Sequence, residues 1–349
     1  RQRQMCIRDR DGRYDFMETG SLISIKKNVE NILIPSEEES VSMFPMDFEE
    51  FLWARGEELL ADAIRQSFAD RRAMSPLLDN KADRLFREYM LVGGMPQAVE
   101  RYLGTSDMGN VDRVKRQILH LYAQDIEQYG GDSKERVKRI FDEIPGQLSK
   151  HEKKFTLSSL GENAREREYG DAFFWLDESF LINRCMNATD PHVGLRLHQE
   201  DSTMKCYMGD TGLLVTQVFA DRAYTSNELY RDILFGKLEV NEGMLVENVV
   251  AQQLRASGHR LFFYSRYSRQ AKDRMEIDFL LIGEYSNAAM KARVCPVEVK
   301  STKRYKTSSL DKFKNKFDSR VGMQYVLHPR PMRVEGDRLY LPLYMAHCL

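Results

Sequence analysis

The last third of the chain carries the pattern that most restricts its fold. Apolar and charged residues alternate with a period of two in several short runs, and helical periods precede and follow them. We expect helices at residues 241–257 and 308–319. Strands are expected at residues 261–266, 275–282, 293–300 and 324–328, with two shorter ones at 338–341 and 343–346. The order α-β-β-β-α-β predicts a small mixed sheet flanked by helices, and therefore a mixed α/β fold class.

Charged residues interrupt two of these expected strands. Glu298 and Lys300 are two residues apart in Pro296-Val-Glu-Val-Lys-Ser301, so both point to one face of the sheet. Asp278 interrupts the apolar run of the neighbouring strand, and Glu247 lies in the preceding helix. Two carboxylates and a backbone carbonyl are ligands that suit Mg²⁺, and such a metal lowers the pKa of a bound water. The simpler alternative is a solvated sheet face, on which charges two residues apart are common.

This arrangement resembles the PD-(D/E)xK nuclease superfamily, in which a helix with a glutamate precedes an aspartate on the second strand and E-x-K on the third. The resemblance covers about residues 241–329. It implies that Asp278 and Glu298 are metal ligands for Mg²⁺, that Lys300 is a catalytic lysine and that Glu247 is an acidic partner. Many such folds have lost their activity, and a fold does not fix a function. A catalytic and a structural role therefore both stay open.

Helical periods dominate residues 46–150. Apolar residues return at helical spacing over residues 46–70, where Asp47 and Glu50 have the spacing of a capping box. A second helix should end at Gly93-Gly94-Met95-Pro96, because glycine and proline terminate helices. Residues 1–10 show no period, resemble translated adapter sequence, and are expected to be an artefact or disordered. The other elements expected in this half are a strand at 14–25 and helices at 81–92, 98–102, 109–129 and 133–150.

Residues 133–225 have a different character. A helix at 135–150, a short apolar run and a helix at 164–178 precede two strand-like runs, at 180–182 and 204–208. Helix, helix, helix and two strands is the order of a winged helix. We expect a structural spacer rather than a DNA-binding surface, because acidic residues crowd this region: Glu162, Glu166, Glu168, Asp171, Asp177 and Glu178.

Segments along most of the chain resemble a family of bacterial and archaeal AAA-type ATPases that end in a domain of unknown function with a nuclease-like core. The similar segments span about residues 11–329 and comprise Thr19-Gly20-Ser21, residues 44–52, residues 91–96, Ile144-Pro145, Lys154-Phe155, Trp175-Leu176, residues 210–214 and the two nuclease-like strands. The resemblance implies the C-terminal part of an ATPase module with a helical lid at 11–132, a winged-helix-like domain at 133–225, and a nuclease-like, restriction-endonuclease-like domain at 226–349.

The phosphate-binding loop G-x-x-x-x-G-K-[ST] of that family does not occur in residues 1–349. The resemblance therefore implies that ATP binds to the full-length parent only, and that this truncated form does not hydrolyse it. Thr19 and Ser21 match the sensor-1 position of the family, and Pro96 matches a G-x-P element that approaches the nucleotide. By itself, Gly94-Met95-Pro96 is also an ordinary helix stop.

The charge of the chain is unevenly distributed. The whole chain has 52 Lys and Arg against 53 Asp and Glu, but residues 260–349 hold 18 and 9. This basic segment predicts possible contact with nucleic acid. No C-x-x-C pair and no long apolar run occur, so we expect a cytoplasmic location without membrane contact.

These features leave two alternative functions. The first is Mg²⁺-dependent action on nucleic acid. The second is a non-catalytic regulatory module, whose nuclease-like scaffold binds a protein partner under the control of the parent's ATPase.

Overall fold

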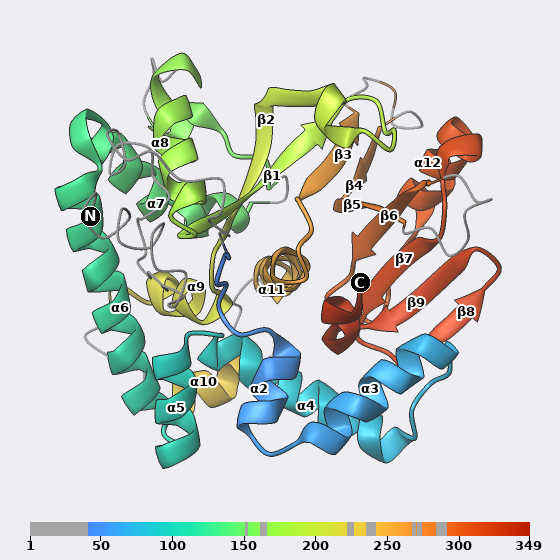
Figure 1. The fold of residues 1–349 in the computed structure, drawn as a ribbon, viewed down its shortest axis with the longest axis horizontal. Coiled ribbons are helices and arrows are strands. Elements are labelled where there is room, and N and C mark those ends of the chain that lie inside the picture. The colour runs from blue at the N-terminus through green and yellow to red at the C-terminus, as the bar shows by residue number, and fades with distance from the viewer. Residues whose placement is uncertain are drawn as a thin grey trace, which may run out of the picture.

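The computed structural model describes residues 41–150, 153–160, 166–221, 227–234, 242–266, 270, 274–283 and 292–349 (Figure 1). Helices and two sheets make up the described part, so the predicted mixed α/β class is confirmed. The expected strand at 14–25, with Thr19 and Ser21, lies outside the described residues. No helix within the described ranges combines the length and the apolar character needed to cross a membrane.

The chain begins its described part with a layer of helices. The single helix predicted over 46–70 is wrong, because the structure has two helices there, α2 (Phe48–Ala54) and α3 (Glu58–Asp70). Gly56 between them has a φ of +73°, which glycine adopts without strain and which ends the first helix. The predicted capping box at the start of α2 is confirmed: the Glu50 backbone N–H donates to Asp47 Oδ1 at 2.8 Å, and the Asp47 backbone N–H donates to Glu50 Oε2 at 2.9 Å.

The next helices follow the predicted pattern with different starting points. Helix α4 (Pro76–Val92) begins five residues before the predicted start, because Ser75 caps it and Pro76 takes a first-turn position. It ends at Gly93, as predicted, with a φ of +85°. Helices α5 (Pro96–Thr105) and α6 (Met108–Tyr129) then run side by side along one end of the molecule (Figure 1).

The middle of the chain combines helices with a β-hairpin. Helices α7 (Lys134–Leu148) and α8 (Glu166–Glu178) precede the antiparallel strands β1 (Ile182–Ala188) and β2 (Gln199–Met208), and a 3₁₀ helix lies at Leu157–Leu160. Helices α9 (Thr211–Val218) and α10 (Asn227–Leu234) follow. Two α-helices and a 3₁₀ helix precede the hairpin, and the assignment of a winged helix stays a prediction. Strand β1 also pairs in parallel with β3 (Phe262–Arg266), so the hairpin continues into the C-terminal region through a sheet of order β2-β1-β3-β4.

The C-terminal region forms the second sheet, of order β5-β6-β7-β9-β8. The predicted strand at 275–282 is divided at Asp278: β4 (Met275–Ile277) pairs with β3, whereas β5 (Phe279–Ile282) pairs with β6. The strand predicted at 343–346 is wrong. These residues form a 3₁₀ helix (Leu343–Cys348), in which four consecutive side chains are buried, a pattern that an alternating strand on one sheet face does not produce. The remaining elements are β6 (Val294–Val299), α12 (Ser308–Phe317), β7 (Gln324–His328), β8 (Arg333–Glu335) and β9 (Arg338–Pro342).

Helix α11 (Glu242–Ala256) lies at the centre of the molecule, where Figure 1 shows it end-on between the helical layer and the sheets. Every residue from Met244 to Leu254 is buried. A helix that is buried on all sides normally carries apolar residues all round. This one instead presents four polar side chains to different neighbours, and these side chains position the candidate site and the contacts around it: Glu247, Asn248, Gln252 and Gln253.

Candidate functional site

The structure brings together all four residues that the sequence singles out, Glu247, Asp278, Glu298 and Lys300. The antiparallel register of β5 and β6, in which Phe279 faces Val297, places Asp278 at the end of β6. The backbone N–H of Val299 donates a hydrogen bond to Asp278 Oδ2 at 2.8 Å. Lys300 Nζ lies 2.8 Å from Glu298 Oε2. Their proposed chemical roles stay predictions.

Glu298 is the most buried member of this group, with 1% of its surface exposed. Burial raises the pKa of Glu298 to about 7, and the charge of Asp278 adds to the rise, whereas Lys300 opposes it. Burial also raises the pKa of Asp278, and the negative charge of Glu247 raises it further. A carboxyl group must be deprotonated to bind a metal ion, so the raised pKa of each of these carboxyl groups opposes metal binding.

Glu247 is bound by groups from the upstream half of the chain. Its Oε1 accepts hydrogen bonds from Tyr207 Oη at 2.5 Å and from Lys205 Nζ at 3.1 Å, and its Oε2 accepts one from Lys153. Burial alone would raise the pKa of Glu247, but Lys205 and Lys153 lower it to about 2. Glu247 is therefore ionised, and its charge is compensated by lysines rather than left available to a ligand.

Lys205 is the site residue that the sequence analysis missed. It lies on β2 with 1% of its surface exposed, and its ammonium group lies 2.8 Å from Glu276 Oε1 and 3.6 Å from Asp278 Oδ1, in addition to its bond to Glu247. Burial alone would lower the pKa of Lys205, but these three carboxylates raise it well above its usual value. The available signal was a lysine inside the apolar strand Met-Lys-Cys-Tyr-Met, where a charge needs a partner.

The predicted Mg²⁺ ligands do not fit that ion as they lie. Mg²⁺ takes six oxygen ligands in a nearly ideal octahedron. Asp278 accepts a backbone hydrogen bond and faces Lys205, while Glu298 is paired with Lys300. Among the described residues, no group of three or more His, Cys, Asp or Glu side chains is arranged to hold a metal ion. We therefore derive no reaction step through Mg²⁺ at this site.

A cluster of free positive charges lies next to Lys300. Strands β6 and β7 are parallel, so their carboxyl ends meet at one edge of the sheet. A hydrogen bond of 2.7 Å between the Tyr305 hydroxyl and His328 Nδ1 connects the segment after β6 with the end of β7. Four exposed cations follow these two strands and make no ion pair within the described residues. We call them the basic edge: Lys303, Arg304, Lys306 and Arg330.

The neighbouring basic residues differ from the basic edge in being compensated. Lys314 pairs with Asp337 at 2.7 Å, and Arg338 pairs with Asp311 at 2.7 Å. Lys316 donates to the hydroxyl of Tyr264. The basic segment predicted from the sequence therefore includes paired residues on and around α12, and residues at the strand ends that make no ion pair with the part of the chain that the structure describes.

Pro96 is an exposed first-turn residue of α5, and the glycines before it are held by the rest of the fold. The backbone N–H of Gly94 donates to Asp210 Oδ2 at 2.6 Å, and the Met46 backbone N–H donates to the Gly94 carbonyl at 2.8 Å. A nucleotide-contacting role for Pro96 stays a prediction.

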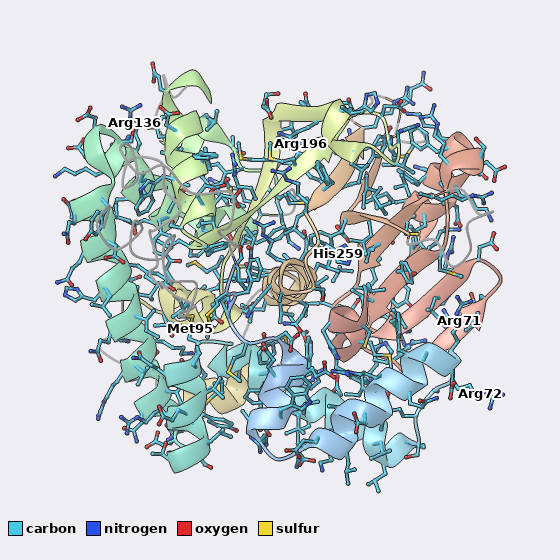
Figure 2. The ribbon with its side chains drawn as sticks, in the orientation of Figure 1. Arg71, Arg72, Met95, Arg136, Arg196 and His259 are labelled. Atoms are coloured by element: carbon cyan, nitrogen blue, oxygen red, sulfur yellow. The ribbon has the colours of Figure 1, made fainter. Side chains whose placement is uncertain are left out.

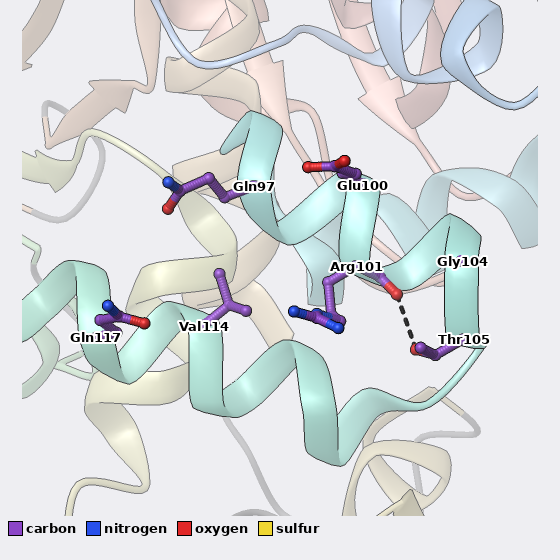
Figure 3. A pocket seen from close by; sticks show the side chains of 7 residues that line it. All are labelled: Gln97, Glu100, Arg101, Gly104, Thr105, Val114 and Gln117. Carbon is purple, nitrogen blue, oxygen red and sulfur yellow. Dashed lines mark hydrogen bonds between the residues drawn. The ribbon is translucent and has the colours of Figure 1, made fainter.

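A separate cleft of about 540 Å³ lies between α5 and α6, and Arg101 points into it (Figure 3). Its lining residues are Gln97, Glu100, Arg101, Gly104, Thr105, Val114 and Gln117.

The fold and the site define a mixed α/β protein with a buried cluster of carboxylates and lysines. Residues 83–223 match the family model described as a domain of unknown function, DUF8612, and residues 242–345 match a second domain of unknown function, DUF4143. The first match extends across the predicted boundary at residue 132, and the division into domains stays a prediction. No curated protein and no solved structure matches the chain.

Proposed function

We propose that this chain belongs to an AAA-type ATPase parent and that its region 242–345 is a module that binds nucleic acid without cleaving it. The basic edge is the observation that carries the proposal. Four exposed cations that make no ion pair within the described ranges follow the carboxyl ends of parallel strands, a common place for ligands on α/β sheets. Clustered lysine and arginine side chains neutralise backbone phosphates and supply most of the affinity of sequence-independent binding.

The absence of cleavage follows from the charges inside the site. Asp278 and Glu247 are compensated by Lys205, and burial raises the pKa of Glu298 to about 7. The ATPase part of the proposal rests on the sequence resemblance alone. In this arrangement the parent's nucleotide cycle controls when the basic edge is presented to its partner.

Binding assays on the full chain test this proposal. Fluorescein-labelled single- and double-stranded DNA and RNA of 20 nucleotides are titrated with the protein at several salt concentrations. We expect replacement of all four basic-edge residues by alanine to weaken binding at least tenfold and to flatten the salt dependence, because each lost phosphate contact lowers the slope by about 0.9.

A matched variant removes four exposed arginines from the helical half, which contribute nothing to the basic edge: Arg71, Arg72, Arg101 and Arg113. This variant has the same change in net charge and should bind as the wild type does. Equal losses in the two variants would mean that only net charge matters, and the proposed binding surface would then be wrong.

A Mg²⁺-dependent nuclease is the second candidate function. The convergence of Asp278, Glu298 and Lys300 favours it. The same substrates are incubated with Mg²⁺ or Mn²⁺, with the wild type and with Glu298→Ala. Cleavage by the wild type that Glu298→Ala abolishes would establish the nuclease and refute the non-catalytic proposal.

A further inference from the structure

We infer that Lys205 is an internal counter-ion that occupies the acidic site in place of a divalent cation, and that strand β2 thereby keeps this site closed to metal. The inference rests on the nuclease-like reading of residues 242–345 in the proposed function. We call the three carboxylates around the lysine the acidic cluster: Glu247, Glu276 and Asp278.

Lys205 lies within ion-pair distance of three carboxylates. An ammonium group has three N–H donors and no acceptor. Carboxylate oxygens of Glu276, Glu247 and Asp278 lie 2.8, 3.1 and 3.6 Å from its nitrogen. One buried cation therefore lies within ion-pair distance of every member of the acidic cluster.

The counter-ion and the acidic cluster come from different parts of the chain. Lys205 lies on β2, and it pairs in register with Cys185 on β1. Glu247 belongs to α11, Glu276 to β4, and Asp278 to the bend between β4 and β5. The upstream hairpin thus supplies the cation to carboxylates of the downstream region.

The other charged groups around the acidic cluster reinforce this arrangement. Lys153, which precedes the strand-like contact at Lys154, binds the second oxygen of Glu247 and the carbonyl of Gly243. Lys300 is directed to Glu298 rather than to the acidic cluster. The Lys205 ammonium also lies 5.2 Å from the centre of the Phe263 ring, which covers it on another side.

The experiment replaces the lysine by an uncharged side chain of similar length, Lys205→Met, in the full chain. Removing the cation leaves the three carboxylates of the acidic cluster without Lys205, and carboxylate oxygens are the ligands that a hard divalent ion prefers. We expect Lys205→Met to bind Mn²⁺ in isothermal titration and to gain at least 3 °C in melting temperature at 1 mM Mn²⁺. The wild type and the charge-conserving Lys205→Arg should show neither response.

A second variant keeps the inference testable where Lys205→Met does not fold. Lys205→Met combined with Glu276→Gln removes one charge of each sign and leaves Glu247 and Asp278 as ligands. Mn²⁺ binding by either folded variant, together with none by the wild type, supports the inference. Equal binding by wild type and variants overturns it, as does no binding by folded variants. These readouts are independent of nucleic-acid binding, so the basic-edge proposal can fail while this one stands.

Discussion

Asp210 accepts a hydrogen bond of 2.6 Å from the backbone N–H of Gly94, although the two residues are 116 positions apart in the sequence. The other oxygen of Asp210 caps α9 through the backbone N–H of Leu213 at 2.9 Å. Gln252 of α11 also donates to Asp210, at 3.3 Å. One buried carboxylate thus connects three segments: the turn after α4, the start of α9 and the central helix α11. Among the residues in Figure 2, Met95 marks the chain just beyond this contact.

Gly94 has no room for a side chain at this contact. A Cβ atom on Gly94 would lie 2.1 Å from the carbonyl oxygen of Met46 and 2.8 Å from its backbone nitrogen. We expect Gly94→Ala to destabilise the protein by about 4 kcal/mol or to prevent folding, because backbone atoms cannot move aside cheaply. Urea denaturation followed by circular dichroism measures the change.

Gly104 provides the matched control for that substitution. It lies inside α5, and a Cβ atom there would meet nothing within 4 Å. Gly104→Ala should stabilise the protein by about 0.5–1 kcal/mol, because alanine loses less backbone freedom in a helix. Similar effects of the two substitutions would contradict the close packing at Gly94.

Gln253 connects α11 with the helical layer through both ends of its amide. Its Oε1 accepts from the Phe48 backbone N–H at 2.9 Å, and its Nε2 donates to the Tyr89 hydroxyl at 2.8 Å. Gln253→Ala leaves the buried Phe48 N–H without its side-chain acceptor, whereas the Tyr89 hydroxyl keeps its hydrogen bonds to Met46 and Gln252. We expect a loss of about 1–3 kcal/mol in unfolding free energy. Exposed Gln117→Ala on α6 should change it by less than about 0.5 kcal/mol. A cost for Gln253→Ala as small as that of Gln117→Ala would show that α11 is not held in this way.

Glu298 gives the stability of the protein a pH dependence of defined sign. Its pKa rises from 4.5 to about 7 on folding, so the folded state holds the proton more tightly. The stabilisation from this group is complete below pH 4.5 and is lost as the pH rises through 7. Glu298→Gln removes this loss, so the variant should gain about 3 kcal/mol relative to wild type between pH 5 and 8. A constant difference in unfolding free energy across this range would refute the shift.

His328 should act in the opposite direction. Burial, together with Arg333 and Arg330, lowers its pKa from 6.5 to about 4. Its contribution to stability is present above pH 6.5 and is lost as the pH falls towards 4, because the folded state resists protonation. An NMR titration of the imidazole, assigned with the variant His328→Gln, should show a midpoint near 4. A midpoint near 6.5 would mean that the ring is open to solvent.

Local chemistry in the sequence determined many of the elements and some of the site. The Asp47–Glu50 spacing predicted the start of α2. The period-two alternation predicted that Glu298 and Lys300 point the same way, and the two side chains form an ion pair, with Lys300 one residue beyond the end of β6. These features depend on residues within one or two turns or strand steps, so no tertiary information is needed to see them.

Only the tertiary structure decided what compensates the charges. At Asp278 the expected strand passes from the first sheet to the second. The residues before it pair with β3, and the residues after it pair with β6. Lys205 meets Glu247 across 42 residues, and Gln253 meets Phe48 across 205. A sequence period reports whether a residue faces inward, but the free energy of a buried charge depends on which distant group lies opposite. That partner is fixed only when the strands and α11 pack together.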